Sequence, residues 1–280
     1  MTWTPLGSQP EAHPALVPGI PQWMRGSLRA WFVQQFSRYD SAGSHLGWDV
    51  SRMRRYDLAA RSQPLAEMLS FHGGRTLFDS LEDDQILRII DWVVMDRGPR
   101  DVLGKTAALE KILRDGGSSW KVGVRNGTPG LEDRVPLGVQ DAADQAMSTP
   151  GDAGRLLSEA WQAVYGINPQ PDLGYRKSIE AVEAVVIPQV MKNDATATLG
   201  KAIGQMRAQG DWKLPFVKEH SQNPSQDVVL GMLQALWSGH SDRHPGTAVY
   251  VLSSQEAAEA AVSIAVSLVN LFASGGIARR

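Results

Sequence analysis

In the second half of the chain, apolar residues recur at helical spacing, in segments that proline and glycine separate. The last segment is the clearest, because Ser253 and Glu256 form a capping box and Gly275-Gly276 provides a helix end. Its apolar positions share one face: Ala258, Ala261, Val262, Ala265, Leu268, Val269 and Phe272. This continuous face predicts a helix from about Ser253 to Ser274 that is buried along one side.

Four more helices are predicted in this half. Asp152 is suited to begin one of them and Asp172 the next, which bends or ends at Pro188 because proline has no amide donor. Two shorter apolar patterns cover residues 198–208 and 228–237. Five helices with short connections predict an all-α fold, an antiparallel helical bundle.

The first half has weaker patterns. Helices are predicted over about 21–36, 80–95, 102–114 and 139–147, with a short basic segment over 49–61. Alternation on both sides of Arg-Asn-Gly predicts a small β-hairpin or an extended pair between 120 and 135. The break at Thr149-Pro-Gly-Asp152 suggests three parts: a flexible, proline-rich lead over 1–21, a mostly helical N-terminal domain over 22–150, and a C-terminal bundle over 151–280.

Composition narrows the chemistry more than the fold. The chain has no cysteine, which excludes disulfides, thiolate metal sites and cysteine nucleophiles, and which suits the cytoplasm. The net charge of −2 gives no global basic field, although a local basic patch could still bind nucleic acid. We expect no secretion signal, because residues 1–21 are rich in proline and have no basic start followed by an apolar run. We also expect no membrane contact, because Glu259, Ser263, Ser267 and Asn270 interrupt the longest apolar segment.

The loop from Leu236 to Gly246 carries the densest candidate chemistry. It places His240, Asp242, Arg243 and His244 within five positions between two predicted helices. Histidine exchanges protons near neutral pH, and a guanidinium can hold a phosphate, so these residues point to phosphodiester chemistry or phosphate binding. If RNA supplies its own 2′-hydroxyl, no metal or other cofactor is needed.

Two other interpretations of the same loop stay open. It could be a polar surface connection without chemistry. A metal site of His240, Asp242 and His244 would need a fourth ligand such as His220, and the spacing matches no common metal motif.

Two other polar groups are candidates for binding or catalysis. Arg176, Glu180 and Glu183 form a stripe along one predicted helix, either as intrahelical ion pairs or as a polar lining that faces the loop. In the N-terminal half, a run of arginines is either a solvated helix face or a phosphate contact. The candidates in this run are Arg52, Arg54 and Arg55.

From Leu156 onward the sequence resembles the C-terminal domain of bacterial abortive-infection proteins, within the HEPN superfamily. The residues that carry the likeness are Tyr175-Arg-Lys-Ser-Ile-Glu-Ala-Val-Glu183, Ala197-Thr-Leu-Gly200, Leu236-Trp with Asp242-Arg-His-Pro-Gly246, and the helix from Glu256 to Val269. The resemblance implies a HEPN-like helical bundle that commonly forms a homodimer and, in active members, cleaves RNA without a metal during phage defence. It also implies an antitoxin or a phage-derived trigger as a further partner.

The resemblance assigns roles residue by residue. His244 matches the motif histidine, whereas active members also carry an arginine several positions before it, where this chain has Trp237, Ser238 and Gly239. Two hypotheses follow. In the first, the protein is an endoribonuclease with His244 as acid and base, Arg243 as phosphate clamp, and Glu180 or Glu183 as orienting carboxylate. In the second, it is a non-catalytic HEPN-like module that binds RNA, a nucleotide or a protein.

Overall fold

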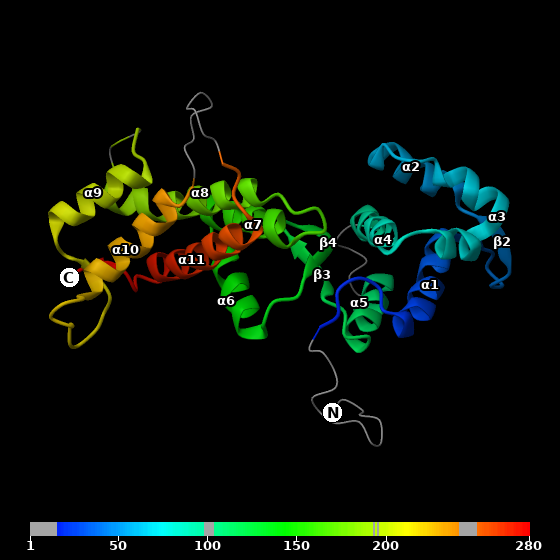
Figure 1. Ribbon diagram of the computed structural model, residues 1–280, viewed down its shortest axis with the longest axis horizontal. Helices are drawn as coiled ribbons and strands as arrows, with labels where there is room; N and C mark the ends of the chain where they lie inside the picture. The colour runs from blue at the N-terminus through cyan, green and yellow to red at the C-terminus, as the bar shows by residue number, and fades with distance from the viewer. Residues whose placement is uncertain (1–15, 98–103, 193, 195, 241–250) are drawn as a thin grey trace, which may run out of the picture. The chain divides into compact units, whose positions relative to one another are not determined.

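A computed structural model describes residues 16–97, 104–192, 194, 196–240 and 251–280, without the side chain of residue 137. The chain divides into two compact units, unit 1 (Met1–Arg134) and unit 2 (Val135–Arg280). Helices dominate both, and the strands form three two-stranded sheets among the described residues (Figure 1). The predicted all-α character is confirmed at this level, while the finer HEPN-like assignment stays a prediction.

Unit 1 contains five helices and two hairpins within its described part. The helices are α1 (Gln22–Phe36), α2 (Val50–Ala60), α3 (Leu65–Ser80), α4 (Asp83–Arg97) and α5 (Lys105–Asp115); the strands are β1 (Ser37–Tyr39), β2 (His45–Trp48), β3 (Trp120–Arg125) and β4 (Thr128–Asp133). Three aromatic rings fill the centre of its core. The ring of Phe32 lies 5.1 Å from that of Phe36 and 5.3 Å from that of Phe78, centroid to centroid, so α1 is joined to α3.

The predicted hairpin near residue 125 is confirmed. Strands β3 and β4 pair antiparallel from Trp120 opposite Asp133 to Arg125 opposite Thr128. Asn126 and Gly127 form the turn with φ of 50° and 76°, the left-handed geometry that an Asn-Gly pair favours between two strands.

Two elements of unit 1 have no counterpart in the predictions, namely α3 and the β1–β2 hairpin. Helix α3 contains Gly73 with φ of 77°, so two helical stretches meet at a kink. A glycine pair in mid-helix weakens the periodic signal by which a helix is predicted.

The described end of the proline-rich lead is held in place, whereas the rest of the predicted flexible segment over 1–21 lies outside the described residues. Val17 forms backbone hydrogen bonds with Gly117 and Ser119, at 2.8 and 2.9 Å from nitrogen to oxygen. The amide of Ile20 donates to the carboxylate of Asp83 at 3.0 Å, and the Ile20 side chain is buried. These contacts fix residues 17–20 against unit 1.

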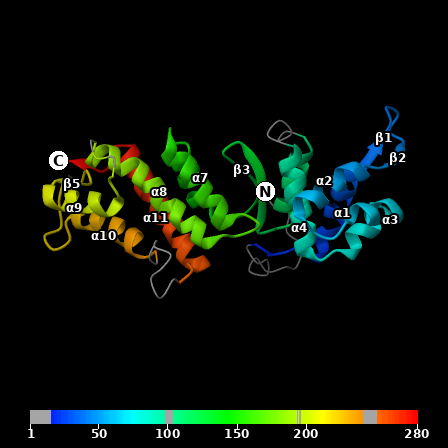
Figure 2. The same ribbon diagram turned by 90° about the horizontal axis from the view of Figure 1, so that it is seen from above.

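Unit 2 is a helical bundle around one apolar cluster. Its elements are α6 (Leu137–Met147), α7 (Asp152–Tyr165), α8 (Pro171–Val190), α9 (Leu199–Gln209), α10 (Ser225–Ser238), α11 (Gln255–Ala273) and the short strand pair β5 (Trp212–Lys213) and β6 (Ala278–Arg279). Helix α8 packs against α7, α9 and α11, and both views show it running alongside α7 and α11 (Figures 1 and 2). The predicted helices of this half are therefore present.

Helix α11 is buried along the predicted face. All seven apolar residues of that face are at most 2% exposed. The cap lies one residue later than predicted, since the hydroxyl of Ser254 rather than that of Ser253 accepts from the amide of Ala257. By length and apolar composition α11 could cross a membrane, but 44% of the relevant window is buried inside the protein, as in the core helix of a folded domain.

The boundary between the units lies at Arg134/Val135 rather than at the predicted position 150. Helix α6 packs against α7 and α11, and its Ala143 and Ala146 are fully buried in the cluster of unit 2. The side-chain amide of Asn270 donates to the carbonyl of Ala142 at 2.9 Å. The break at 149–152 is therefore a turn within unit 2.

Candidate functional site

The loop from Leu236 to Gly246 begins at the C-terminal end of α10. Helix α10 ends at Ser238, with Gly239 as its C-cap, and His240 follows. The predicted site residues Asp242, Arg243 and His244 lie outside the described residues. The description resumes at Val251, shortly before α11. The structure thus defines the two points between which this segment runs.

The chain before and after this segment contacts the same residue, Asp172, in the first turn of α8. One carboxylate oxygen of Asp172 lies 3.6 Å from Nε2 of His240. The same oxygen lies 3.3 Å from the hydroxyl oxygen and 3.4 Å from the amide nitrogen of Ser253, which both donate to it. Asp172 therefore contacts the chain on either side of the segment 241–250.

This arrangement differs from the helix-capping role predicted for Asp172. The N-cap of α8 is Gln170, and Pro171 is the first helical residue, where its missing amide costs nothing. Asp172 is the next residue and its side chain is turned toward the start of α11 and the end of α10. Proline takes over the start of the helix, so the carboxylate is available for the loop.

His240 is buried at this junction. Its side chain is 4% exposed, and its ring lies 5.2 Å from that of Tyr175, centroid to centroid. The Tyr175 hydroxyl donates to the carbonyl of Leu236 at 3.2 Å, and burial raises the pKa of this phenol. A β-carbon at position 239 would collide with the same hydroxyl, which explains the glycine there. Tyr175, on α8, therefore packs against the C-terminal end of α10.

Neither ring nitrogen of His240 has a hydrogen-bond partner among the described residues. A buried imidazole beside a carboxylate is well placed to exchange a proton or to be held in one orientation. The structure thus brings the predicted site residue His240 next to Asp172, which the sequence had not indicated as part of the site. Sequence reasoning missed the contact between Asp172 and His240 because it spans 68 residues and has no local signal.

The Arg176, Glu180 and Glu183 stripe is spread along α8. Glu180 lies two turns beyond Asp172, about 12 Å along the helix axis, and Glu183 about 16 Å. The Glu180 carboxylate lies 2.8 Å from the ammonium of Lys177 and 3.8 Å from the guanidinium of the exposed Arg176. Hydrogen bonding to Glu180 is the main cause that raises the pKa of Lys177. This part of the stripe consists of intrahelical ion pairs, one of the two interpretations left open by the sequence.

Glu183 has a structural position at the start of α9. Its carboxylate accepts from the amide of Leu199 at 2.9 Å, while the Thr198 hydroxyl accepts from the amide of Lys201. Two first-turn amides of α9 are thereby satisfied, and the negative charge lies where the helix dipole favours it. Glu183 therefore joins α8 to α9.

The three arginines of the basic run lie on α2 in unit 1, and they are not equivalent. Arg52 is buried and donates to Asp96 at 3.1 Å and to the carbonyl of Gln35 at 2.9 Å. Arg55 is 55% exposed and lies 3.3 Å from the same carboxylate, and Arg54 is exposed. Because Arg52 is enclosed by internal partners, it cannot serve as the predicted phosphate contact; only Arg54 and Arg55 are accessible for that role.

His220 is not available to complete a metal site in this conformation. It is exposed in unit 2, and its Nδ1 accepts from the amides of Gln222 and Asn223, both at 3.2 Å. Within the described ranges, no group of three or more histidine, aspartate or glutamate side chains is gathered for metal binding.

No known protein family, characterised protein or solved structure matches the chain. The interpretation of the site therefore depends on its own residues and contacts.

Proposed function

We propose that unit 2 is a metal-independent endoribonuclease of the abortive-infection type, acting in the cytoplasm during phage defence. The observation that supports this proposal best is the position of Asp172, which contacts His240 and Ser253 on either side of the segment bearing Arg243 and His244. A catalytic loop needs fixed ends, because the rate of a bond-breaking step depends steeply on the alignment of the reacting groups.

The proposed reaction is transphosphorylation within RNA. His244 accepts the proton of the 2′-hydroxyl, and that oxygen attacks the neighbouring phosphorus. The bond from phosphorus to the 5′-oxygen breaks, the 5′-oxygen leaves with a proton from the imidazolium or from water, and a 2′,3′-cyclic phosphate remains. Arg243 stabilises the charge that builds on the phosphoryl oxygens.

The positioning carboxylate in this proposal is Asp172 rather than Glu180 or Glu183. The two glutamates have partners on α8 and α9, whereas Asp172 lies beside an imidazole of the loop. Asp172→Asn keeps the shape and an acceptor but removes the charge, so we expect slower cleavage with little change in stability. A shifted pH profile would distinguish this role from a purely structural one.

The decisive test is incubation of the purified protein with total RNA in EDTA, followed by mapping of the cut ends. The expected product is a 2′,3′-cyclic phosphate. His244→Ala should reduce cleavage by at least about 10²-fold, the usual scale for a general acid–base residue. His220→Ala is the matched control, since His220 is exposed and bonds only within its own loop among the described residues. Full activity of His244→Ala would contradict the assignment.

Substitutions of the neighbouring residues sharpen the test. Arg243→Lys should also be costly, because an ammonium cannot present the planar fork that grips a phosphate. His240→Ala should have a milder effect on cleavage, although it leaves Asp172 without its buried neighbour.

A second candidate function is a non-catalytic module that binds RNA, a nucleotide or a protein. It is favoured by the partners of Glu180 and Glu183, because both carboxylates that the sequence suggested for catalysis have structural contacts. The same assay separates the two functions. An inert parent protein that retains RNA in EDTA, with loop variants that lose only affinity, would favour the binding module.

We further propose that unit 2 forms a homodimer, on the basis of the resemblance alone. The apolar surface of α11 adds no support, because none of its residues is among the exposed large hydrophobic side chains. Sedimentation at tens of micromolar tests the proposal, and a monomer there would contradict it. An antitoxin or phage-derived trigger stays part of the same proposal, tested by co-purification before and after infection.

A further inference from the structure

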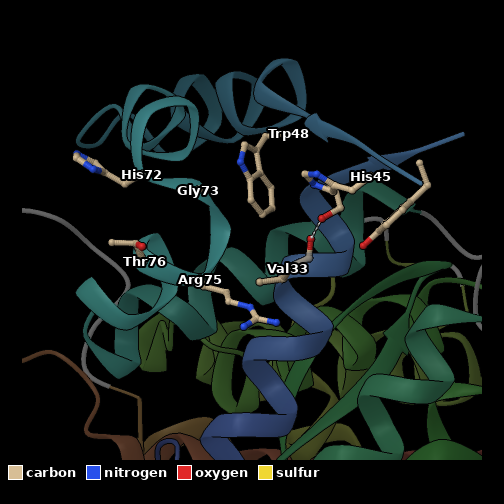
Figure 3. Close-up of a pocket in the computed structure, with 9 residues that line it drawn as sticks. Val33, His45, Trp48, His72, Gly73, Arg75 and Thr76 are labelled. Carbon is tan, nitrogen blue, oxygen red and sulfur yellow. Dashed lines mark hydrogen bonds between the residues drawn. The ribbon is translucent and has the colours of Figure 1, made fainter. Parts of the chain in front are cut away.

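Unit 1 contains a pocket of about 500 Å³ that the proposed ribonuclease function does not use. It lies between the β1–β2 hairpin, the end of α1 and the kink of α3 (Figure 3). Its lining is polar and aromatic and consists of Val33, Ser37, Tyr39, His45, Trp48, His72, Gly73, Arg75 and Thr76. Pockets of this size commonly bind small molecules.

The hairpin supplies a row of aromatic rings. The His45 ring lies 4.9 Å from that of Trp48 and 5.6 Å from that of Tyr39, centroid to centroid, both nearly edge to face. Trp48 is half-buried, Tyr39 is 49% exposed, and no described residue accepts a hydrogen bond from the indole N–H. The rings therefore leave an aromatic surface and a donor open to a ligand.

The glycine pair of α3 sets the position of the indole. A β-carbon on Gly74 would lie 2.8 Å from the Trp48 ring, and one on Gly73 would lie 3.0 Å from it. Gly73 also has φ of 77°, a conformation that side-chain-bearing residues rarely adopt. The kink that interrupts α3 thus brings its backbone against one side of Trp48 and aligns the ring with the pocket.

The charges of the lining favour an anion. It contains the guanidinium of Arg75 but no carboxylate. Arg75 is exposed and has no ion pair or hydrogen bond with any described residue, in contrast to Arg29 of α1, which lies 2.8 Å from Asp79. Figure 3 shows Trp48, His45 and Arg75 around the same opening, whereas His72 points away beyond the kink. Of the three hydroxyls of the lining, that of Ser37 donates to the carbonyl of Val33.

We propose that this pocket binds a mononucleotide, with its base against Trp48 and its phosphate on Arg75. A planar aromatic ligand fits the ring surface, since every nucleic-acid base has a π-face that can stack on an aromatic side chain. A guanidinium without a carboxylate partner is suited to a bidentate phosphate contact. The pocket is large enough for one nucleotide, and the combination of rings with a single accessible guanidinium selects for a base and a phosphate together.

Isothermal titration of the full chain tests the proposal. The probes are the four ribonucleoside 5′-monophosphates, adenosine, inorganic phosphate and a tetradeoxyadenylate, which lacks the 2′-hydroxyl that cleavage needs. We expect at least one monophosphate to bind with a dissociation constant below about 1 mM, more tightly than adenosine or phosphate alone. Absence of binding by all four monophosphates would overturn the proposal, as would binding of the tetranucleotide alone.

Variants connect the binding to the pocket. Arg75→Gln should weaken monophosphate binding at least about tenfold and leave adenosine binding unchanged, because it removes a charge-assisted hydrogen bond. Trp48→Leu should weaken both ligands while keeping apolar contact with the glycine pair, and circular dichroism checks its folding. Arg207→Gln removes an exposed helical arginine of unit 2 and is the matched control. Unchanged monophosphate affinity in Arg75→Gln would place the binding elsewhere and overturn the assignment.

Discussion

Unit 2 and unit 1 are both mostly helical, but different interactions join their elements. In unit 2, the buried cluster consists of apolar residues that recur at helical spacing on α7, α8 and α11. Both units also contain polar contacts between distant residues, but only unit 1 has fully charged side chains among the buried residues that the structure describes: Arg52, paired with Asp96, and Glu132, paired with Lys121. A periodic apolar pattern therefore indicates most of the helices of unit 2, whereas the core of unit 1 also depends on individual charged pairs.

The largest expected effect is in the apolar core of unit 2. Leu268→Ala should reduce the free energy of unfolding by about 2–5 kcal/mol, because this fully buried side chain leaves a cavity. Hydrogen exchange measured by mass spectrometry should show faster exchange in peptides from α6 to α11. Ser267→Ala, next to it on the exposed face, is the control and should change little. Equal stabilities of the two variants would mean that the α11 face is not the core.

A buried polar pair in unit 1 should matter nearly as much. Arg52→Ala removes the partner of Asp96 and the donor to the carbonyl of Gln35, so we expect a loss of about 3 kcal/mol. Arg55→Ala affects the same carboxylate from an exposed position and should cost about 1 kcal/mol or less. Chemical denaturation of both variants measures the difference. If the two cost the same, unit 1 would not depend on its buried pair.

Substitution of Asp91 should have a smaller effect, and it should increase stability rather than decrease it. Burial raises the pKa of this carboxyl, which accepts from the amide of Leu131 at 2.7 Å. The fold therefore favours the protonated form, and the stability this form contributes is present at low pH and is lost as pH rises from the ordinary aspartate pKa through the raised one. Asp91→Asn keeps an acceptor without a charge, so it should raise the melting temperature at pH 7.

The pH dependence is the control for that prediction. The advantage of Asp91→Asn should shrink as pH falls toward 3.8, the ordinary value, because the wild-type carboxyl then becomes neutral too. Asp84→Asn, an exposed acid of the same helix paired with Arg88, should give no gain at any pH. A constant difference between wild type and Asp91→Asn across this range would contradict the role of the charge.

The smallest expected effect is at the start of α9. Glu183→Gln keeps an acceptor for the amide of Leu199 and loses only the charge near the helix N-terminus, at a cost below about 1 kcal/mol. Thermal unfolding followed at 222 nm measures this cost, and RNA cleavage measured in parallel should be unchanged. A large loss of cleavage without a loss of stability would return Glu183 to the catalytic group.

Helices with one apolar face could be predicted from the sequence. The face of α11 and the Asn-Gly hairpin were predicted because each depends on neighbouring residues alone. Helix α3 was missed because Gly73 and Gly74 interrupt its apolar pattern. These positions need glycine because the indole of Trp48, on β2, packs closely against them. The boundary at 134 was missed because α6 belongs to unit 2 through contacts with a helix about 120 residues later in the chain.

The candidate site was harder to predict than the fold. His240 is identifiable as a polar residue next to a predicted helix, but nothing local indicates that it is buried beside Tyr175. The same holds for Arg52, whose sequence context suggests an exposed basic face, whereas its side chain donates to the end of α1. Sequence patterns indicate which face of a helix is apolar, but they do not indicate which charged residue finds a buried partner far along the chain.

The meeting of both ends of segment 241–250 at Asp172 has a consequence for how this protein can vary between relatives. Because His240 and Ser253 contact the same carboxylate, residues can be inserted or removed between them without moving α10 or α11. The entropy of closing a loop grows slowly with its length, so that doubling the length costs only about 0.6 kcal/mol. Selection can therefore change the length of this segment independently of the bundle that supports it.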